Sequence, residues 1–167
     1  MTKTNKSLII ALVLVVGFLG VVIITKPAPD VGNNLTADLS SAVISGERFF
    51  DFGSVSMAAG NVSHEFKIKN NGSSAVEIEK MYTSCMCTTA YFVRGGEQAG
   101  PFGMAGHGFV PPLRKTIESG EEVTISVVFD PAAHGPAGIG LVQREVYLKD
   151  KAGNSVAVLG FRATVTP

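Results

Sequence analysis

Two stretches of the chain alternate between apolar and polar residues in the way that half-buried β-strands do. In residues 62–69 the apolar side includes Val62, Phe66 and Ile68, and residues 123–129 repeat the pattern with valine, isoleucine and phenylalanine. Successive side chains of a strand point to opposite faces of a sheet. Each stretch therefore predicts a strand with one face in a core.

Shorter strand signals follow one another through most of the chain after residue 46. They are apolar or aromatic runs bounded by Gly, Pro, Asn or Asp, at residues 48–53, 76–81, 88–94, 141–149 and 156–165. The last two runs flank a turn at residues 150–154, which predicts that they close the domain as an antiparallel pair.

The segment ahead of residue 85 predicts a hairpin followed by an irregularity. An Asn-Gly pair at positions 71 and 72 predicts a tight turn that pairs residues 62–69 with residues 76–81. The alternation slips between Ile78 and Tyr82, and we expect a β-bulge there.

About seven short strands, with no amphipathic helix between them, predict an all-β domain over residues 46–167. The 19 glycines and eight prolines agree with many turns joining short elements. At 167 residues the chain has room for one core rather than two. We therefore expect a single antiparallel β-sandwich of the immunoglobulin type.

The N-terminal part of the chain predicts a membrane anchor. Residues 8–24 are an apolar run of 17, longer than the apolar region of about 7 to 15 residues in a signal peptide. We expect a retained transmembrane helix over residues 8–25, rather than a cleaved signal peptide. Lysines at positions 3 and 6 precede the run, so the positive-inside rule places residues 1–7 in the cytoplasm and exports the rest.

Two other stretches are rich in residues that break regular structure. Residues 26–45 lack a sustained hydrophobic period and predict a flexible linker between anchor and domain. Residues 95–112 contain six glycines and three prolines. Such a stretch is too long for an ordinary connection, so we expect either a functional loop or a disordered one.

Charge and motifs exclude several classes of function. Lys and Arg together number 14, as do Asp and Glu, so no basic stripe predicts nucleic-acid binding. The Gly106-His107-Gly108 sequence lacks the lysine and the following helix of a phosphate loop, so no nucleotide site is predicted. No serine nucleophile elbow is present, and we expect the protein not to be an enzyme.

The only two cysteines of the chain, Cys85 and Cys87, are separated by Met86. In an extended strand their Cα atoms would lie about 6.6 to 6.8 Å apart, at the upper limit for a disulfide. Three interpretations stay open: a structural or incidental pair, two thiolate ligands for copper(I) or zinc, and a redox-labile dithiol. A catalytic dithiol is more often C-x-x-C at a helix start, and no such helix is evident.

If the cysteines bind a soft metal, further ligands must come from elsewhere in the chain. Met104 and His107 lie within the glycine-rich stretch, and His134 lies in a second Gly- and Pro-rich segment. Thioether and imidazole groups suit copper and zinc. Cys85, Cys87, Met104, His107 and His134 are therefore the candidate metal ligands, beside the simpler interpretation that both histidines lie in solvated loops.

Four motifs in order make the chain similar to a known family. They are Phe50-Asp51-Phe52-Gly53-Ser54-Val55, then the segment from His64 to Gly72, then Ser84-Cys85-Met86-Cys87-Thr88, and finally Val127-Val128-Phe129-Asp130-Pro131. This set resembles a bacterial exported domain-of-unknown-function family similar to Hydin-type (ASH/MSP-type) immunoglobulin-like domains. Met86 stands where that family usually has glycine, and the stretch over residues 95–112 is longer than expected. The resemblance implies the fold, export to the cell envelope and a binding role.

Together these observations order the hypotheses. The first is a non-enzymatic, membrane-anchored interaction or structural module that binds another envelope protein on the periplasmic or extracellular side. The second is a soft-metal domain that uses Cys85 and Cys87, and the third is a thiol redox protein. The distance of the two glycine-rich segments from the cysteines discriminates among these hypotheses. A metal site requires the ligand side chains of both segments and of the cysteines to lie within about 2 to 4 Å of a common point.

Overall fold

The structure is a computed structural model that describes residues 43–167. The predicted cytoplasmic N-terminus, the anchor over residues 8–25 and the linker up to residue 42 lie outside the described residues. No helix among residues 43–167 is long and apolar enough to cross a membrane. Residues 43–45, assigned to the linker by the sequence, form a strand, so the domain begins at least three residues before position 46.

The described residues contain eleven strands and two short 3₁₀-helices, and no α-helix. The elements are β1 Val43–Ser45, β2 Phe49–Ser56, η1 Met57–Ala59, β3 Val62–Asn70, β4 Val76–Ile78, β5 Lys80–Thr83, β6 Thr88–Arg94, β7 Glu97–Phe102, β8 Lys115–Ile117, β9 Glu122–Phe129, η2 Gly135–Gly138, β10 Gly140–Lys149 and β11 Ser155–Thr166. The all-β prediction is confirmed. The predicted number of about seven strands is too low for three reasons. Strands β1 and β8 have three residues each and cannot show an alternating pattern. Strand β7 lies in the glycine-rich stretch, and the single run predicted over residues 76–81 divides into β4 and β5.

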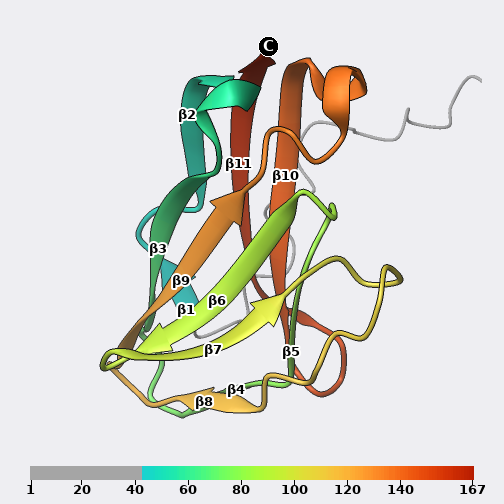
Figure 1. Cartoon of the computed structure of the whole chain (residues 1–167). Helices are drawn as coiled ribbons and strands as arrows, with labels where there is room; N and C mark the ends of the chain where they lie inside the picture. The colour runs from blue at the N-terminus through green and yellow to red at the C-terminus, as the bar shows by residue number, and fades with distance from the viewer. Residues whose placement is uncertain (1–42) are drawn as a thin grey trace, which may run out of the picture. The chain divides into compact units, whose positions relative to one another are not determined.

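Two larger sheets pack face to face as a sandwich, as Figure 1 shows. The five-stranded sheet has the order β1-β3-β9-β6-β7, and the four-stranded sheet has the order β2-β11-β10-β5. Strands β4 and β8 form a separate two-stranded ribbon at one end. The predicted closing pair is confirmed as β10 and β11. Strand β2 runs parallel to β11, so the sandwich is mainly but not purely antiparallel.

The core lies between the two larger sheets. Every second residue of β9 is buried, from Val123 to Phe129, as the alternation predicts. From the other sheet Phe161 of β11 packs against Phe129, with ring centroids 5.2 Å apart. These side chains belong to one continuous cluster of buried apolar residues, and burying such surface is the main stabilising contribution to a domain of this size.

The predicted hairpin between residues 62–69 and 76–81 is wrong. Strand β3 pairs with β1 and β9, whereas β4 pairs with β8. The cause is Asn70, which reads as a turn residue in the sequence but is completely buried in the structure. Its side-chain amide donates to the carbonyl oxygens of Ser74 and Ile117, both at 2.9 Å, and its side-chain oxygen accepts from the Gly72 amide. These bonds turn the chain away from β3 and toward β8.

The predicted bulge between Ile78 and Tyr82 is a change of sheet instead. Strand β4 ends at Ile78 in the small ribbon, and β5 begins at Lys80 in the four-stranded sheet. Glu79 lies between them, and its carbonyl oxygen accepts from the amide of Leu113 at 2.8 Å. The alternation slips because the chain rotates as it passes from one sheet to another.

The glycine-rich stretch over residues 95–112 is partly a regular hairpin. Gly95 and Gly96 both have positive φ angles, of 57° and 86°, and they join β6 to β7. Positive φ at both central residues is the requirement of a type I′ hairpin turn. The connection that remains, from Gly103 to Arg114, returns to β5, where the Gly103 carbonyl accepts from the Thr83 amide at 3.0 Å.

The buried Asn70 gives a test of the fold. We expect Asn70→Ala to lower the free energy of unfolding by about 2–3 kcal/mol, because it leaves buried carbonyl groups without donors. Asn71→Ala, at the exposed neighbouring position, is the matched control and should change stability by less than about 0.5 kcal/mol. Urea unfolding followed by circular dichroism measures both. Equal effects of the two substitutions would contradict the structural role of Asn70.

Candidate metal and thiol centre

The two cysteines lie in the turn that joins β5 to β6. Because β5 belongs to the four-stranded sheet and β6 to the five-stranded sheet, residues 84–87 carry the chain across the sandwich. The Thr88 amide donates to the Cys85 carbonyl at 3.1 Å, which closes the turn. The cysteines are therefore not in an extended strand, and the strand spacing of about 6.6 to 6.8 Å does not apply.

Residues on both sides of the turn hold it in place. The buried Thr83 hydroxyl lies 2.9 Å from the Cys85 carbonyl oxygen and 3.0 Å from that of Thr88. The Ser84 amide donates to the Glu145 carbonyl, and the Ser84 hydroxyl accepts from the Glu145 amide, both at 2.9 Å. The turn is thus fixed to strand β10 next to Arg144.

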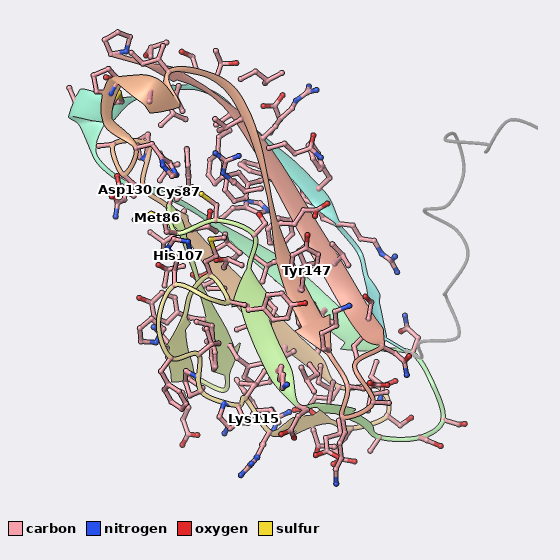
Figure 2. All side chains as sticks on the ribbon, turned by 90° about the vertical axis from the view of Figure 1, so that its right-hand side faces the viewer. Met86, Cys87, His107, Lys115, Asp130 and Tyr147 are labelled. Carbon is pink, nitrogen blue, oxygen red and sulfur yellow. The ribbon has the colours of Figure 1, made fainter. Side chains whose placement is uncertain are left out.

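A second crossing of the sandwich brings His134 to the same place. Strand β9 ends at Phe129, which pairs with Thr88 at the start of β6. The segment that follows Phe129 must therefore begin beside the cysteine turn, and the Asp130 amide donates to the Cys87 carbonyl at 2.8 Å. Figure 2 shows Asp130, Met86 and Cys87 in one region of the domain, with Lys115 toward the other end.

The side chains of Cys85, Cys87 and His134 meet in this region. The Cys85 and Cys87 Sγ atoms are 2.7 Å apart, and Cys85 Sγ is 3.1 Å from His134 Nε2. All three ligand atoms lie within 4.8 Å of one another. Cys87 is buried, Cys85 is half-buried and His134 is exposed, so the centre opens to solvent on the side of Cys85 and His134.

The structure brings together three of the five candidate ligands. The group of neighbouring cysteine, histidine and acidic side chains found in residues 43–167 contains Cys85, Cys87 and His134 but not His107. The backbone of Met104 forms an isolated β-bridge with Thr83 of strand β5. Met86 points outward, with 55% of its surface exposed.

Arg144 is a part of the centre that the sequence did not indicate. Its Nε donates to Cys87 Sγ at 3.2 Å, and its Nη1 donates to the Gln143 carbonyl at 2.8 Å. An arginine in a predicted half-exposed strand is ordinarily a surface residue, and the two partners lie 57 positions apart. Strand β10 pairs with β5 so that Val146 faces Thr83. This pairing places Arg144 beside the turn that follows Thr83, and it is the only feature that would have indicated the role of Arg144.

These contacts shift the pKa values of the two thiols in opposite directions. Partial burial acts to raise the pKa of Cys85. Hydrogen bonds from the Cys87 side chain and backbone and from His134, with the positive charge of Arg144, outweigh it and lower the pKa to about 7. Burial and the contact with Cys85 raise the pKa of Cys87, against the opposing effect of Arg144. At neutral pH Cys85 is thus partly a thiolate, the form that attacks electrophiles and binds metals.

A shallow cleft leads from solvent to this centre. It has a volume of about 490 Å³ and is lined by Ser84, Cys85, His134, Gln143, Arg144 and Glu145. Of the two sulfurs, only that of Cys85 belongs to a residue of this lining. Molecules that enter the cleft therefore meet Cys85 before Cys87.

Comparison with known proteins agrees with the resemblance predicted from the sequence. Residues 44–100 match the family described as "Protein of unknown function (DUF1573)". The fold is similar to that of a protein of unknown function from Porphyromonas gingivalis W83, with a TM-score of 0.52 and 14% identity over 76% of this chain and 50% of that one. The chain thus spans half the length of that protein. At such identity the likeness shows the fold alone, and it agrees with the all-β sandwich of residues 43–167.

A second solved structure is similar at a lower score. The ASH/PapD-like domain of human CEP192 aligns with a TM-score of 0.44 and 14% identity, covering 84% of this chain and 98% of that domain. No curated protein is significantly similar to the chain in sequence.

The lowered pKa of Cys85 gives a test of the centre. In metal-free reduced protein, we expect the rate of Cys85 alkylation by iodoacetamide to rise with pH around a midpoint of about 7. An unperturbed thiol has its midpoint at about 8.5. Mass spectrometry of the labelled peptide measures the rate.

The Arg144→Gln variant separates the charge effect from simple exposure. Loss of the guanidinium removes a contribution that lowers the pKa of Cys85, so the midpoint should move to higher pH. A wild-type midpoint near 8.5, unchanged in the variant, would contradict the electrostatic description.

Proposed function

We propose that the domain binds a soft metal ion through Cys85, Cys87 and His134. The observation that supports this most directly is the convergence of the three ligand atoms within 4.8 Å, from two segments that are far apart in the sequence. Thiolate and imidazole are the ligands preferred by copper(I) and zinc. This is a binding function, in keeping with the expectation that the protein is not an enzyme.

Metal binding requires a small opening of the cysteine pair. With metal–sulfur bonds of about 2.3 Å in tetrahedral geometry, two thiolate sulfurs lie about 3.8 Å apart. The sulfurs in the structure are 2.7 Å apart, so they would separate by about 1 Å. The exposed Met86 side chain leaves the turn room to adjust. Cys85 and His134 line the cleft, so an ion held there would be accessible to exchangeable ligands from solvent.

Copper(I) is the ion proposed for this centre, because soft thiolate ligands select it. Two thiolates and one monovalent cation sum to one negative charge, and the Arg144 guanidinium beside Cys87 would offset that charge. The hydrogen bond from Arg144 Nε would also orient the Cys87 sulfur, as groups outside the ligand set commonly do.

We further propose that this domain is displayed outside the cytoplasmic membrane by the anchor predicted over residues 8–25. In that setting it would also contact an envelope protein, as the immunoglobulin-like fold allows. Met86, in the cysteine turn, is 55% exposed, and we propose it as one residue of the contact with such a partner.

Metal binding is tested with the full-length chain under reducing conditions. We expect one copper(I) per chain by native mass spectrometry, and no bound copper in the Cys85→Ser/Cys87→Ser double variant. His134→Gln should weaken binding more than about tenfold, which corresponds to about 1.4 kcal/mol. A competition titration with a colorimetric copper(I) chelator measures the affinity.

His107→Gln is the matched control, because His107 is a candidate ligand from the sequence that lies outside the group of three. Its affinity for copper(I) should equal that of the wild type. Equal copper uptake by the wild type and the double variant would contradict the metal centre. An effect of His107→Gln as large as that of His134→Gln would contradict the ligand assignment.

The anchor and the contact surface are tested together in intact cells. A photo-crosslinking residue placed at Met86 should give an adduct with an envelope protein, and the same residue at the exposed Lys151 should not. The adduct should stay with the membranes after an alkaline wash, because a transmembrane helix resists extraction. Release by the wash would contradict the anchor, and equal adducts at both positions would contradict the surface.

A further inference from the structure

We propose that the same two cysteines, when no metal is bound, exchange with disulfides, with Cys85 as the attacking thiol and Cys87 as the resolving thiol. This activity goes beyond metal binding. It uses the same three side chains but requires no metal, so each proposal can fail without the other. The argument depends on exposure, distance and the charged groups around the sulfurs.

The two cysteines differ in exposure, as an attacking thiol and a resolving thiol should. Cys85 is half-buried and lines the cleft, whereas Cys87 is 3% exposed and lies behind it. A disulfide on another molecule can reach Cys85 through the cleft. Attack at Cys87 would require the turn to open, so the first step is assigned to Cys85.

The distance between the sulfurs allows the second step without rearrangement of the fold. Both cysteines are free, and their Sγ atoms are 2.7 Å apart, compared with about 2.05 Å in a disulfide. The turn closed by the Cys85–Thr88 hydrogen bond provides the bend that an extended C-x-C segment lacks. Closing the remaining gap takes a smaller movement than opening the pair for a metal.

The groups around the sulfurs have complementary roles in the exchange. His134 Nε2 is 3.1 Å from Cys85 Sγ and can take the thiol proton as the sulfur attacks. Arg144 Nε is 3.2 Å from Cys87 Sγ and would stabilise that sulfur as it loses its proton. Arg144 is therefore assigned as the residue that stabilises the Cys87 thiolate, and His134 as the proton acceptor.

The reaction transfers two electrons from the pair to the substrate disulfide. The Cys85 thiolate attacks one substrate sulfur, the substrate S–S bond breaks, and the departing thiolate takes up the proton lost by Cys85. Cys87 then loses its proton and attacks Cys85 Sγ, which forms the Cys85–Cys87 disulfide and expels the second substrate thiolate, protonated in turn. The substrate is reduced to two thiols and the protein is oxidised to a disulfide.

The substrate is a disulfide exposed enough to enter an open, shallow cleft. Ser84, Gln143 and Glu145 line the cleft beside Cys85 and can donate to or accept from polar groups that flank a substrate disulfide. A low-molecular-weight disulfide and a disulfide on the surface of a peptide share this chemistry. Separate arms of the experiment distinguish these two sources.

The experiment uses the reduced full-length chain with a chelator present. Glutathione disulfide and a short peptide with an exposed disulfide are the two probes, and mass spectrometry follows acid-quenched samples. The wild type should convert to the internal disulfide without a lasting adduct. Cys87→Ala should accumulate one probe adduct on Cys85, and Cys85→Ala should react at least about tenfold more slowly, because its remaining thiol is buried.

Arg144→Gln tests the stabilisation of the Cys87 thiolate separately. It should leave the first adduct at Cys85 able to form but prolong its lifetime in the presence of Cys87, a change that a merely structural role would not produce. Circular dichroism of each variant verifies folding. Formation of the internal disulfide in the acid-quenched wild type tests the proposal without any substitution.

Several results would overturn the proposal. They are a wild type that forms no internal disulfide with either probe, adducts that form equally fast in both single variants, and an adduct that lasts as long in the wild type as in Cys87→Ala. Preference for one probe identifies the source of the substrate. Copper uptake, measured in parallel, reports on the metal centre alone.

Discussion

The register between β6 and β9 is the constraint on which the centre depends. Thr88 at the start of β6 lies opposite Phe129 at the end of β9, so the segment before one and the segment after the other must occupy the same end of the sandwich. Both segments carry the chain between the two sheets. The hydrophobic pattern of each strand fixes this register, because a slip by one residue would turn its apolar side chains to solvent. The packing of the core thus places His134 beside the cysteines.

How much could be predicted from the sequence depended on the length of each pattern. The strands near residues 62–69, 88–94, 123–129 and 141–165 were long enough to show an alternation or a paired turn, and the structure contains them. The hairpin signal of Gly95 and Gly96 was present but was obscured by the glycines that follow. Asn70 could not have been predicted as a buried residue, because asparagine is ordinarily found in turns, and its burial depends on carbonyl groups that belong to other segments.

The sequence predicted the centre only in part, because the contacts within it join segments that are distant in the chain. Cys85 and Cys87 stand out as the only two cysteines, and His134 was a candidate by its chemistry. Their meeting depends on pairing between strands that are distant in the chain. Arg144 had no signal, since its role arises only where β10 passes the turn. A thiol pair takes its chemical character from such neighbours, because the charge and burial around each sulfur decide which one is ionised.

The first strand of the domain lies at the end of β3 that is remote from the centre. Val43 pairs with Asn70 at the far end of β3, while Val62 at the other end of that strand pairs with Phe129 beside the centre. The chain therefore enters the sandwich at the pole opposite the cysteine turn, and the eight residues of β9 separate the two poles by about 24 Å. Any segment joined to the domain ahead of Val43 therefore attaches at the end remote from the cysteine turn.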